Sequence, residues 1–441
     1  MSTSCGIHNR EKFIKFYAVS LAFIHPVITS ISVFYRGKNK HSDKIYMKIS
    51  NFVKISNRVK IKSIRNVKNL AGKIILLRAD LNVPIKDGGI KSDYKIVATL
   101  PTIRYLLRHN AKIIIATHIA KDNTAKPVAK RLSELLGKKI LFVNECVGDK
   151  VKLAAKKMTP KDIIFLENLR FNPGEKKNDK KFAKELAEPA DIYVNDAFAV
   201  SHRNHASLAA IKKYLPSYAG LLLEKEILNL NKILEPKQPL ISIIGGAKIQ
   251  TKISLIKKLA KKSYRVLIGG ALANNFIAAH GFKIGKSMAD KASIKIAAEL
   301  VKKYKNIILP IDVLVAKKIN SKNIEVKPVN QASKDDIILD IGPRTIKLFV
   351  SFIRHANTII WNGPLGYFEN EHFKHGTLSI ARFVASRSTG QAYGAVGGGE
   401  TIEALNLTKM EHYIDWISTG GAAMLTYLGG GPMPGLKGIV K

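Results

Sequence analysis

The sequence predicts an α/β protein with two doubly wound, Rossmann-like parallel-sheet lobes, joined by a helix and with the active site in the cleft between them. Three observations lead to this fold class. From Lys73 onward, short apolar segments typical of buried strands alternate with segments of helical periodicity. The alternation is interrupted once, by a continuous helical stripe at residues 219–234, and then resumes. The length of 441 residues exceeds what one hydrophobic core usually holds.

The first alternating set lies between Lys73 and Asn195 and has the order expected of a parallel sheet. Strands are predicted at residues 73–83, 112–117, 162–166 and 191–195, with helices at 96–107, 128–136 and 182–186. The stripe at 219–234 is then predicted to be the helix that joins the lobes, because Pro236 and Pro239 follow it closely.

The second set begins at Leu240 and repeats the pattern. Strands are predicted at residues 240–244, 265–269, 307–311, 358–362 and 393–396, with a further strand ending at 340–343. Helices are predicted at residues 292–304, from Arg344 onward, and after the glycines 397–399. A second parallel sheet is therefore expected.

Residues 1–60 differ from the rest of the chain and are interpreted as a leader. Residues 16–35 form an uncharged run flanked by lysine and arginine, long enough to span a bilayer or to serve as a targeting signal. Pro26 in the middle of the run counts against a spanning helix. We rank an artefact of the start site, with Met47 as the true start, or a dispensable leader first, targeting second and a membrane anchor third. A chain that starts at Met47 is expected to fold and to keep full activity.

The formal net charge of +40 raises the question of an anionic partner such as nucleic acid or a membrane surface. The lysines are interspersed along the chain and no aromatic-rich RNA-binding pattern accompanies them, so we interpret them as solvated surface residues. We therefore expect no specific nucleic acid and no membrane as partner. Only Cys5 and Cys146 are present, which excludes a disulfide framework and fits a reducing, cytoplasmic compartment.

Polar residues follow the predicted strands of the first set one after another. Asp80 and Asn82, then His118, then Arg170, then His202 and Arg203 stand at successive strand ends. Each alone has an ordinary structural explanation, such as a capping turn or a solvated loop. Because the carboxyl ends of parallel strands meet at one edge of a sheet, together they predict a basic cup for a small, multiply charged anion.

The second set carries a phosphate-like pattern at two strand ends. Gly245 and Gly246 end the strand at 240–244, and Lys248 and Lys252 follow at a spacing that would place both on one face of a helix, if a helix starts there. The pattern is not a Walker motif, and alone it is more often scaffold. Residues 397–399 are three glycines ahead of a predicted helix, which suits phosphate, and Glu400 is a candidate magnesium ligand. The second lobe is therefore interpreted as a nucleotide lobe.

The chain resembles the phosphoglycerate kinase family from about Val67 to Val440. The motifs RADLNVP, LENLRF, VNDAF with SHRNHAS, LLLEKE, IGGAKIQTK, WNGPLGYFE, GGGET and STGGAA occur in unbroken order. The resemblance implies reversible phosphoryl transfer between 1,3-bisphosphoglycerate and ADP, giving 3-phosphoglycerate and ATP with Mg²⁺, in a monomer. It also implies a substrate lobe at residues 61–218, a joining helix at 219–235, a nucleotide lobe at 236–425 and a tail at 426–441 that returns to the first lobe.

The resemblance also implies roles for particular residues. Lys248 and Lys95 would be catalytic, and Lys248 would neutralise the phosphoryl group in transfer. The residues implied in substrate binding are Asp80, Leu81, Asn82, Lys95, His118, Ile119, Ala120, Lys121, Arg170 and Arg203. The residues implied in nucleotide binding are Lys252, Gly342, Glu369, Gly398, Gly399, Glu400 and Thr401, with Glu400 also on the metal.

Four positions depart from the family pattern. Lys95 stands where the family usually has its catalytic arginine, and Lys121 also replaces an arginine, next to Ala120 in place of a glycine. Thr251 replaces an aspartate, and Glu400 stands at the usual position of an aspartate. Lysine cannot make the bidentate contacts of arginine, so these changes bear on rate and substrate affinity rather than on the reaction. The alternative is a protein of this fold with reduced activity that binds nucleic acid or a membrane surface.

Overall fold

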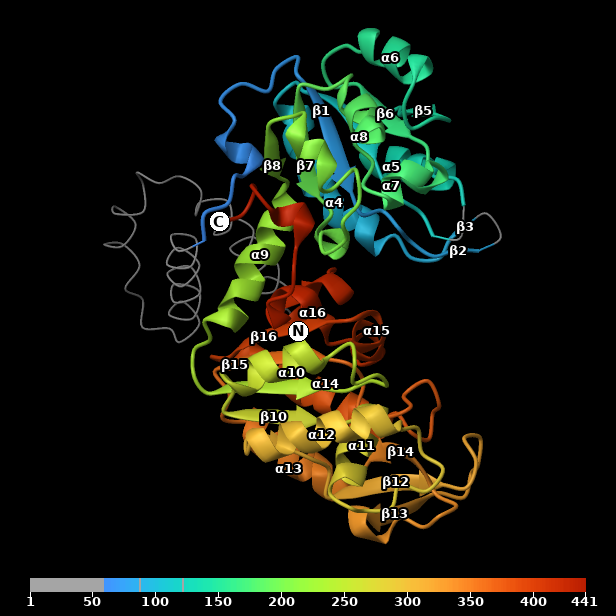
Figure 1. Cartoon of the computed structure of the whole chain (residues 1–441), viewed down its shortest axis with the longest axis vertical. Coiled ribbons are helices and arrows are strands. Elements are labelled where there is room, and N and C mark those ends of the chain that lie inside the picture. Colours follow the sequence, from blue (N-terminus) through green and yellow to red (C-terminus); the bar gives the residue numbers. More distant parts are fainter. Residues whose placement is uncertain (1–58, 87–88, 121–122) are drawn as a thin grey trace, which may run out of the picture. The chain divides into compact units, whose positions relative to one another are not determined.

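Two six-stranded parallel sheets organise the part of the chain that the structure, a computed structural model, describes: residues 59–86, 89–120 and 123–441 (Figure 1). The predicted fold class, an α/β protein with two doubly wound parallel sheets, is confirmed. Residues 1–58 of the predicted leader and the candidate site residue Lys121 lie outside the described residues. Lys60–Lys441 forms one unit by its internal contacts.

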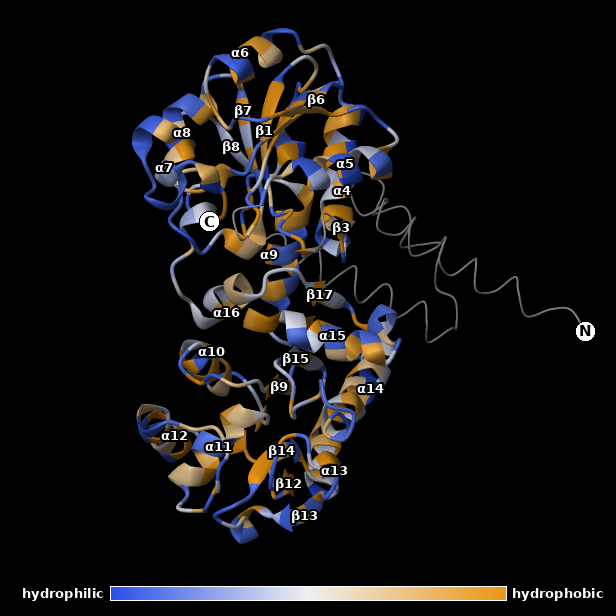
Figure 2. Ribbon diagram, turned by 90° about the vertical axis from the view of Figure 1, so that its right-hand side faces the viewer, coloured by the Kyte–Doolittle hydropathy of each residue, from blue (hydrophilic) through white to orange (hydrophobic). Residues whose placement is uncertain are grey.

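The first sheet has the strand order β5-β6-β4-β1-β7-β8, with every neighbouring pair parallel. Its strands are β1 (Ile74–Ala79), β4 (Lys112–Ala116), β5 (Leu141–Val143), β6 (Ile163–Leu166), β7 (Ile192–Asp196) and β8 (Ser217–Ala219). The central strands are buried on both faces, which explains why their sequences are apolar runs without alternation. Figure 2 shows β1 and β6 largely in the colour of hydrophobic residues.

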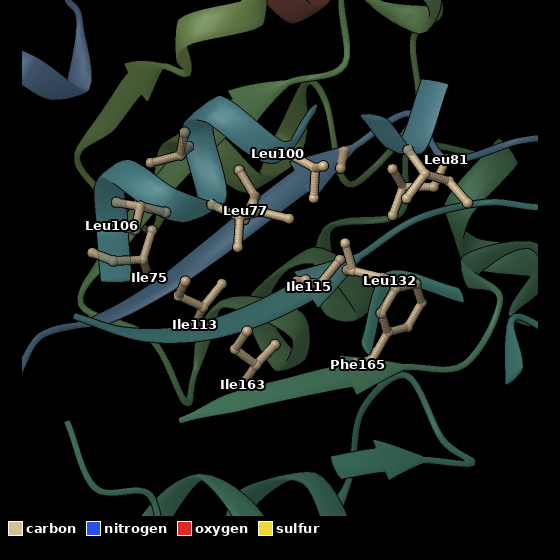
Figure 3. Packing of buried hydrophobic residues seen from close by; sticks show 14 of the residues in the cluster. Ile75, Leu77, Leu81, Leu100, Leu106, Ile113, Ile115, Leu132, Ile163 and Phe165 are labelled. Atoms are coloured by element: carbon tan, nitrogen blue, oxygen red, sulfur yellow. The ribbon is translucent and has the colours of Figure 1, made fainter. Parts of the chain in front are cut away.

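Helices on both faces of this sheet bury the apolar side chains of its strands. They are α4 (Tyr94–Arg108), α5 (Lys126–Leu136), α6 (Asp149–Lys156), α7 (Pro173–Lys176) and α8 (Lys180–Ala187), with the short helices η1 (Ile64–Asn66), η2 (Leu169–Phe171), η3 (Phe198–Val200) and η4 (Ala210–Lys213) and the hairpin β2 (Ile85–Lys86)–β3 (Gly89–Ile90). Figure 3 shows Ile75, Leu77, Ile113 and Ile115 of adjacent strands meeting Leu100 of α4 in one core. This core holds the carboxyl ends of the strands in fixed positions.

The second sheet has the order β11-β10-β9-β15-β16-β17, again with all neighbours parallel. Its strands are β9 (Leu240–Ile244), β10 (Arg265–Ile268), β11 (Ile307–Ile308), β15 (Thr358–Asn362), β16 (Tyr393–Gly397) and β17 (Trp416–Ser418). The associated helices are α10 (Ile253–Ala260), α11 (Ala271–Ala279), α12 (Lys291–Lys303), α13 (Pro343–Ile353), α14 (His375–Thr389), α15 (Gly399–Leu407), α16 (Ala422–Gly429), η5 (Val329–Gln331), η6 (Glu411–Tyr413) and η7 (Pro434–Leu436).

Several predicted boundaries differ from the structure, and three of these differences have a clear physical cause. The strand predicted at 73–83 ends at Ala79, where the chain turns into the loop that carries Asp80. The strand predicted at 307–311 is limited to Ile307–Ile308, because Pro310 has no N–H for a ladder, and the chain then enters a separate antiparallel sheet. That sheet consists of β12 (Asp312–Ala316), β13 (Glu325–Pro328) and β14 (Ile337–Ile341).

The third correction concerns the joining helix, α9 (Leu221–Leu234), which starts two residues later than predicted because Ala219 pairs with β7 as part of strand β8. Helix α9 packs against α4 and β7 at one end and against β15, β16 and α16 at the other. Asp196 at the end of β7 accepts hydrogen bonds from the amides of Leu222 and Leu223 at 2.9 and 3.1 Å. Buried carboxylate contacts therefore hold this helix to the first sheet.

A second buried carboxylate holds α9 to the second sheet. Glu226 accepts hydrogen bonds from Trp416 Nε1 at 3.0 Å, from the Ser418 hydroxyl at 2.9 Å and from both the amide and the hydroxyl of Thr419 at 2.7 Å. With four donors, this fully buried group is well satisfied. The joining helix is thus bonded to the first sheet through its first backbone amides and Asp196 of β7, and to the second sheet through its own Glu226.

The last residues of the chain pack on the first lobe. Ile61 pairs with Val440 in an antiparallel bridge, and the Lys212 ammonium donates to the carbonyl oxygens of Pro434 and Lys437. Asn195 Nδ2 donates to the Gly435 carbonyl at 3.0 Å. Among the described residues, no helix combines the length and the apolar character needed to cross a membrane.

Candidate active site

The polar residues that follow the strands of the first sheet lie at its carboxyl edge. Asp80 and Asn82 follow β1, His118 follows β4, Arg170 lies in η2 after β6, and Arg203 follows η3 after β7. Their close approach is shown by direct contacts and by mutual charge effects. Asp80 Oδ1 lies 3.9 Å from His118 Nδ1, and the charges of both Arg170 and Arg203 act on His118. The structure therefore brings this predicted set together; Lys121 belongs to the same predicted set but is not described.

Lys95, in the first turn of α4, forms an ion pair with Asp80, with 2.7 Å between Nζ and Oδ2. Burial alone would raise the pKa of the Asp80 carboxyl, but the charges of Lys95 and Arg78 outweigh burial and lower it. Asp80 is therefore ionised at neutral pH. Lys95 thus adds a cation to the cup, but Asp80 offsets part of its positive charge.

Arg170 and Arg203 form no ion pair with a carboxylate among the described residues, although the charges of Glu175 and Asp80 act on Arg170 from a greater distance. Burial and the neighbouring Arg203 and Arg78 lower the pKa of the Arg170 guanidinium, and its Nε atom is buried without a hydrogen-bond partner among the described residues. Burial, followed by Arg78, holds the pKa of His118 well below its usual range, so His118 is neutral. Unpaired donors next to clustered positive charge are the complement of a small polyanion.

Three residues implied in substrate binding have their backbone amides engaged inside the lobe. Leu81 N–H donates to Thr117 Oγ1 at 3.1 Å, Ile119 N–H to Asn168 Oδ1 at 3.1 Å, and Ala120 N–H to Asn82 Oδ1 at 2.9 Å. Leu81 and Ile119 are also buried. In this structure these three residues shape the loops of the cup instead of presenting amides to a ligand.

Asn168 and Arg78, which were not predicted from the sequence as site residues, contact residues of the cup. Asn168, in the LEN segment, donates to the carbonyl oxygens of Ile119 and Asn123 at 3.0 and 2.8 Å and accepts from Arg170 N–H. Arg78 is fully buried within β1. A charged residue inside an otherwise apolar strand was the signal for Arg78 in the sequence, and the polar LEN after a strand was the signal for Asn168.

On the second sheet, β9 ends in Gly245 and Gly246, and the turn requires the glycines. Gly246 has φ of 86°, and a Cβ there would lie 2.6 Å from Lys252 Nζ. The Lys252 ammonium folds back across this turn and donates to the Gly245 carbonyl oxygen. Burial lowers the pKa of Lys252 to about 8, with Glu400 opposing the shift. Lys252 is therefore a buried cation placed next to an exposed carboxylate.

The expectation that Lys248 and Lys252 share a helix face was wrong. Helix α10 begins at Ile253, and Lys252 is its N-cap residue, while Lys248 lies in the preceding turn. The physical reason is the contact of Lys252 with Gly245, which needs a tight loop and not a helical turn. Lys248 is exposed and Lys252 is buried, so the two lysines present their ammonium groups in different environments.

The triple glycine spans the end of β16, at Gly397, and the start of α15, at Gly399. Gly398 is its N-cap with φ of 100°, and a Cβ on Gly399 would meet nothing within 4 Å, so the backbone here faces open space. Glu400 is exposed in the first turn, where a carboxylate interacts favourably with the helix dipole. The buried Thr401 hydroxyl accepts from Gly363 N–H at 2.7 Å. Thr401 thus connects this turn to the loop after β15.

A cavity of about 440 Å³ opens beside these loops and has the size of a small-molecule site. Glu369 and Glu400 are the two predicted nucleotide residues that line it, and Gly246, Asp340 and Tyr367 line it as well. Gly342 is not among the lining residues: it is the N-cap of α13, where a Cβ would lie 2.3 Å from the Asp312 side chain. The cavity is the best candidate for the nucleoside part of a nucleotide.

Glu400 offers a single carboxylate, which fits a metal ion that takes most of its ligands from water and from a bound nucleotide. The described residues contain no group of three or more histidine, cysteine, aspartate or glutamate side chains that could hold a metal ion. Mg²⁺ commonly takes one or two protein carboxylates and completes its shell with water and phosphate oxygens. A single exposed carboxylate next to a phosphate-type turn therefore fits Mg²⁺ that arrives with a nucleotide.

Comparisons with known proteins agree with this geometry. The model of the family described as phosphoglycerate kinase matches residues 64–431. The chain is 43% identical over 381 residues to the phosphoglycerate kinase of Dictyoglomus turgidum, covering 84% of this chain and 96% of that protein. It is 42% identical over 388 residues to that of Borreliella burgdorferi, covering 85% and 98%.

Solved structures give the same result. The phosphoglycerate kinase structure from Coxiella burnetii superposes with a TM-score of 0.76 at 36% identity, covering 86% of this chain and 98% of that one. The structure from Pyrococcus horikoshii also has a TM-score of 0.76, at 32% identity, covering 85% and 97%. The similarity therefore extends over both sheets and the helix that joins them.

Proposed function

This chain belongs to the phosphoglycerate kinase family, and from that membership we propose that it transfers a phosphoryl group between 1,3-bisphosphoglycerate and ADP, giving 3-phosphoglycerate and ATP in glycolysis. The reaction makes it a phosphotransferase with a carboxyl group as acceptor. The observation that carries the proposal is the cationic cup at the carboxyl edge of the first sheet. In it Arg170 and Arg203 lie near neutral His118 and the Asp80–Lys95 pair.

In the proposed mechanism, the cup binds the phosphate and the carboxylate of 3-phosphoglycerate. Arg170 and Arg203 supply positive charge, Asp80 accepts the one hydrogen bond that the glycerate hydroxyl can donate, and the Asn82 side-chain amide donates to a substrate oxygen. The attacking group in ATP consumption is an ionised carboxylate, so no general base is needed. This agrees with a cup whose histidine is neutral and whose aspartate is already ionised.

The second half of the proposed site binds the nucleotide. The nucleoside occupies the cavity with Glu369 on the ribose, while Lys252 and the amides at the start of α15 bind phosphates. Mg²⁺ enters as part of the nucleotide substrate and is bound by Glu400. Lys248, exposed and without a carboxylate partner among the described residues, neutralises the phosphoryl group in transfer. Alignment and charge stabilisation supply the catalysis, as is typical of phosphoryl transfer.

A coupled assay for ATP formation from 1,3-bisphosphoglycerate and ADP tests the proposal. We expect magnesium-dependent turnover that is saturable in both substrates and abolished by a chelator. Lack of turnover in a folded sample, with both substrates shown to be intact by a reference kinase, would overturn it. Two further expectations are a monomer, by analogy with the family, and a reducing compartment, because Cys146 is a buried free thiol whose pKa burial raises to about 12.

A further inference from the structure

The buried Arg78 makes a contact with the cup that the family-level description of the site does not use. Its NH2 group lies 3.1 Å from Nδ1 of His118, in a region where both side chains are almost fully buried. A guanidinium can only donate hydrogen bonds. His118 Nδ1 must therefore be the acceptor, and an accepting ring nitrogen carries no proton.

The alternative assignment, with a proton on Nδ1 directed to Asp80, does not fit the distances. Asp80 Oδ1 lies 3.9 Å from Nδ1, which is too long for a hydrogen bond, whereas the 3.1 Å contact with Arg78 is within the normal range. The proton of the neutral ring consequently resides on Nε2. Nε2 makes no hydrogen bond within the described part of the chain and is not one of its buried unpaired atoms, so it remains available as a donor.

Arg78 is itself held in place by a chain of buried groups. Its Nε donates to Ser207 Oγ at 2.9 Å, and Ser207 Oγ donates to Glu175 Oε1 at 2.7 Å. Glu175 is fully buried and also accepts from Ser207 N–H at 2.9 Å, and its charge balances that of Arg78. The orientation of the guanidinium toward His118 is thus fixed from the side opposite the cup.

The charges that face His118 come from every element around it. Arg78 on β1, Arg170 in η2 and Arg203 after η3 oppose protonation of the ring, and Asp80 after β1 favours it. Lys95 on α4 neutralises Asp80, and His205 lies with Glu175 on the far side of Arg78. Positive charge therefore outweighs the single carboxylate, and a second proton on His118 is disfavoured.

We propose that Arg78 is a positioning residue that fixes His118 as the neutral Nε2–H tautomer, so that His118 serves as an uncharged hydrogen-bond donor to the triose substrate over the whole working pH range. The proposal rests on the proposed function for the identity of the substrate. The state of the ring, however, is a property of the free protein. Arg78 acts through His118 and does not touch the substrate.

The direct test is ¹⁵N–¹H NMR of imidazole-labelled wild-type protein between pH 6 and 8, with the His118 signal assigned by its loss in His118→Gln. We expect a neutral ring with Nε2 protonated and Nδ1 unprotonated, and no titration across this range. A protonated Nδ1, or a ring that titrates near its ordinary pKa of about 6.5, would overturn the inference. This outcome is independent of turnover, so it is distinguishable from a failure of the proposed function, which the assay for ATP formation detects.

Kinetics of Arg78→Met and Arg78→Lys supply the second test. Without the cation, the ring can place its proton on Nδ1 and turn a bare Nε2 toward the anion. We expect KM for 3-phosphoglycerate to rise roughly tenfold at pH 8 in Arg78→Met, about the effect of one hydrogen bond to a charged group. As the pH falls through about 6.5, protonation of the ring restores the Nε2 donor, so the ratio of variant to wild-type KM should fall. Taking the ratio cancels the titration of the substrate itself.

Arg78→Lys keeps a cationic donor and should lie much closer to the wild type. The KM for nucleotide and kcat should change little in both variants, a split that general structural damage would not produce. Equal loss of all three parameters, or a KM ratio independent of pH, would contradict the positioning role. If Arg78→Met does not fold because Glu175 is left uncompensated, Ser207→Ala removes the Nε contact of Arg78 and one hydrogen bond to Glu175 but keeps both charges. It should show the same pH-dependent KM ratio in weaker form. A pH-independent ratio in Ser207→Ala would also overturn the proposal.

Discussion

The Lys95 ammonium and the Asp80 carboxylate lie 2.7 Å apart. The lysine that replaces the usual catalytic arginine of the family is therefore already paired with a carboxylate of the protein. Lys95 makes one contact to one carboxylate oxygen. An arginine at this position has five donors in a planar fork and can contact a carboxylate and a phosphate at once. The substrate must therefore bind a Lys95 ammonium that already gives one of its three N–H donors, and part of the effect of its charge, to Asp80.

We predict that Lys95→Arg lowers KM for 3-phosphoglycerate by roughly threefold to tenfold, the effect of about one added hydrogen bond to a charged group. Lys95→Met should raise KM and lower kcat, because Asp80 then repels the substrate anion. Steady-state kinetics with 3-phosphoglycerate varied would measure both. The KM for ATP serves as the internal control and should not change. A weaker substrate affinity in Lys95→Arg would show that the loop around Asp80 has adapted to lysine.

Removing the Lys248 ammonium is expected to reduce turnover by about 10²–10³, by analogy with the loss of one preorganised donor to a developing oxyanion. The reason is that the charge of the phosphoryl group in transfer is then left unbalanced. Single-turnover rates of Lys248→Ala at saturating substrates measure the effect. Lys257→Met, which removes an exposed lysine of α10, is the matched control and should keep the wild-type rate. Near-normal turnover in Lys248→Ala would refute the assignment of the reacting phosphoryl group.

We expect deprotonation of Lys252 to lower kcat/KM for nucleotide at alkaline pH. Burial lowers the pKa of Lys252 to about 8 in the free protein, so the group is an ammonium below that pH and neutral above it. Because kcat/KM reports the free enzyme, we expect it to fall as the pH rises through about 8. In Lys252→Met the value should be low at every pH and this fall should disappear. A wild-type profile that stays flat to pH 9.5 would contradict this assignment.

Asp196 should make the protein less stable as the pH rises through weakly acidic values. Burial raises its pKa from 3.8 to about 6, and its Oδ2 atom is buried without a hydrogen-bond partner in the described chain. The folded state therefore binds a proton between about pH 4 and 6 that the unfolded chain releases, and stability falls across that range. At 1.36 kcal/mol per pH unit, the cost at pH 7 is about 3 kcal/mol.

Asp196→Asn keeps the acceptor for Leu222 and Leu223 and removes the charge. We expect it to be more stable than the wild type at pH 7, by up to about 3 kcal/mol, and to lose this advantage near pH 4. Denaturant titrations at both pH values measure the difference. Asp179→Asn, at the exposed N-cap of α8, is the control and should bring no such gain. Destabilisation of Asp196→Asn at pH 7 would show that the ionised carboxylate is needed to hold α9.

The sequence was sufficient to predict the bounds of elements that are buried along their whole length. Strands β9 and β15 match their predicted residues, 240–244 and 358–362, because both are central, buried along their whole length and mostly apolar. The antiparallel sheet of β12, β13 and β14 was missed, since β13 is a half-exposed strand with a mixed composition. The start of α9 was missed because Ala219 suits a helix as well as the edge strand in which it lies.

The candidate site was predictable where parallel topology alone brings residues together. Asp80, His118 and Arg170 each follow a strand, so the order of the strands in the sheet determines their proximity. Arg78 and its partners Ser207 and Glu175 were not predictable in this way, because their contacts join a strand, a loop and the short helix α7, which only the folded lobe brings into contact. Likewise, the separation of exposed Lys248 from buried Lys252 depends on the carbonyl oxygen of Gly245, which no side-chain pattern reveals.

The pairing of Ile61 with Val440, and the hold of Lys212 on Pro434 and Lys437, have a consequence for synthesis on the ribosome. The segment that closes the first lobe is translated after the whole second lobe. During elongation the first lobe therefore remains incomplete, because Lys212 and the Asn195 side-chain amide lack the carbonyl oxygens to which they donate in the folded protein. Folding of the first lobe is thus completed only after the second lobe has been translated, so a nascent chain arrested before Pro434 lacks the acceptors of Lys212 and Asn195.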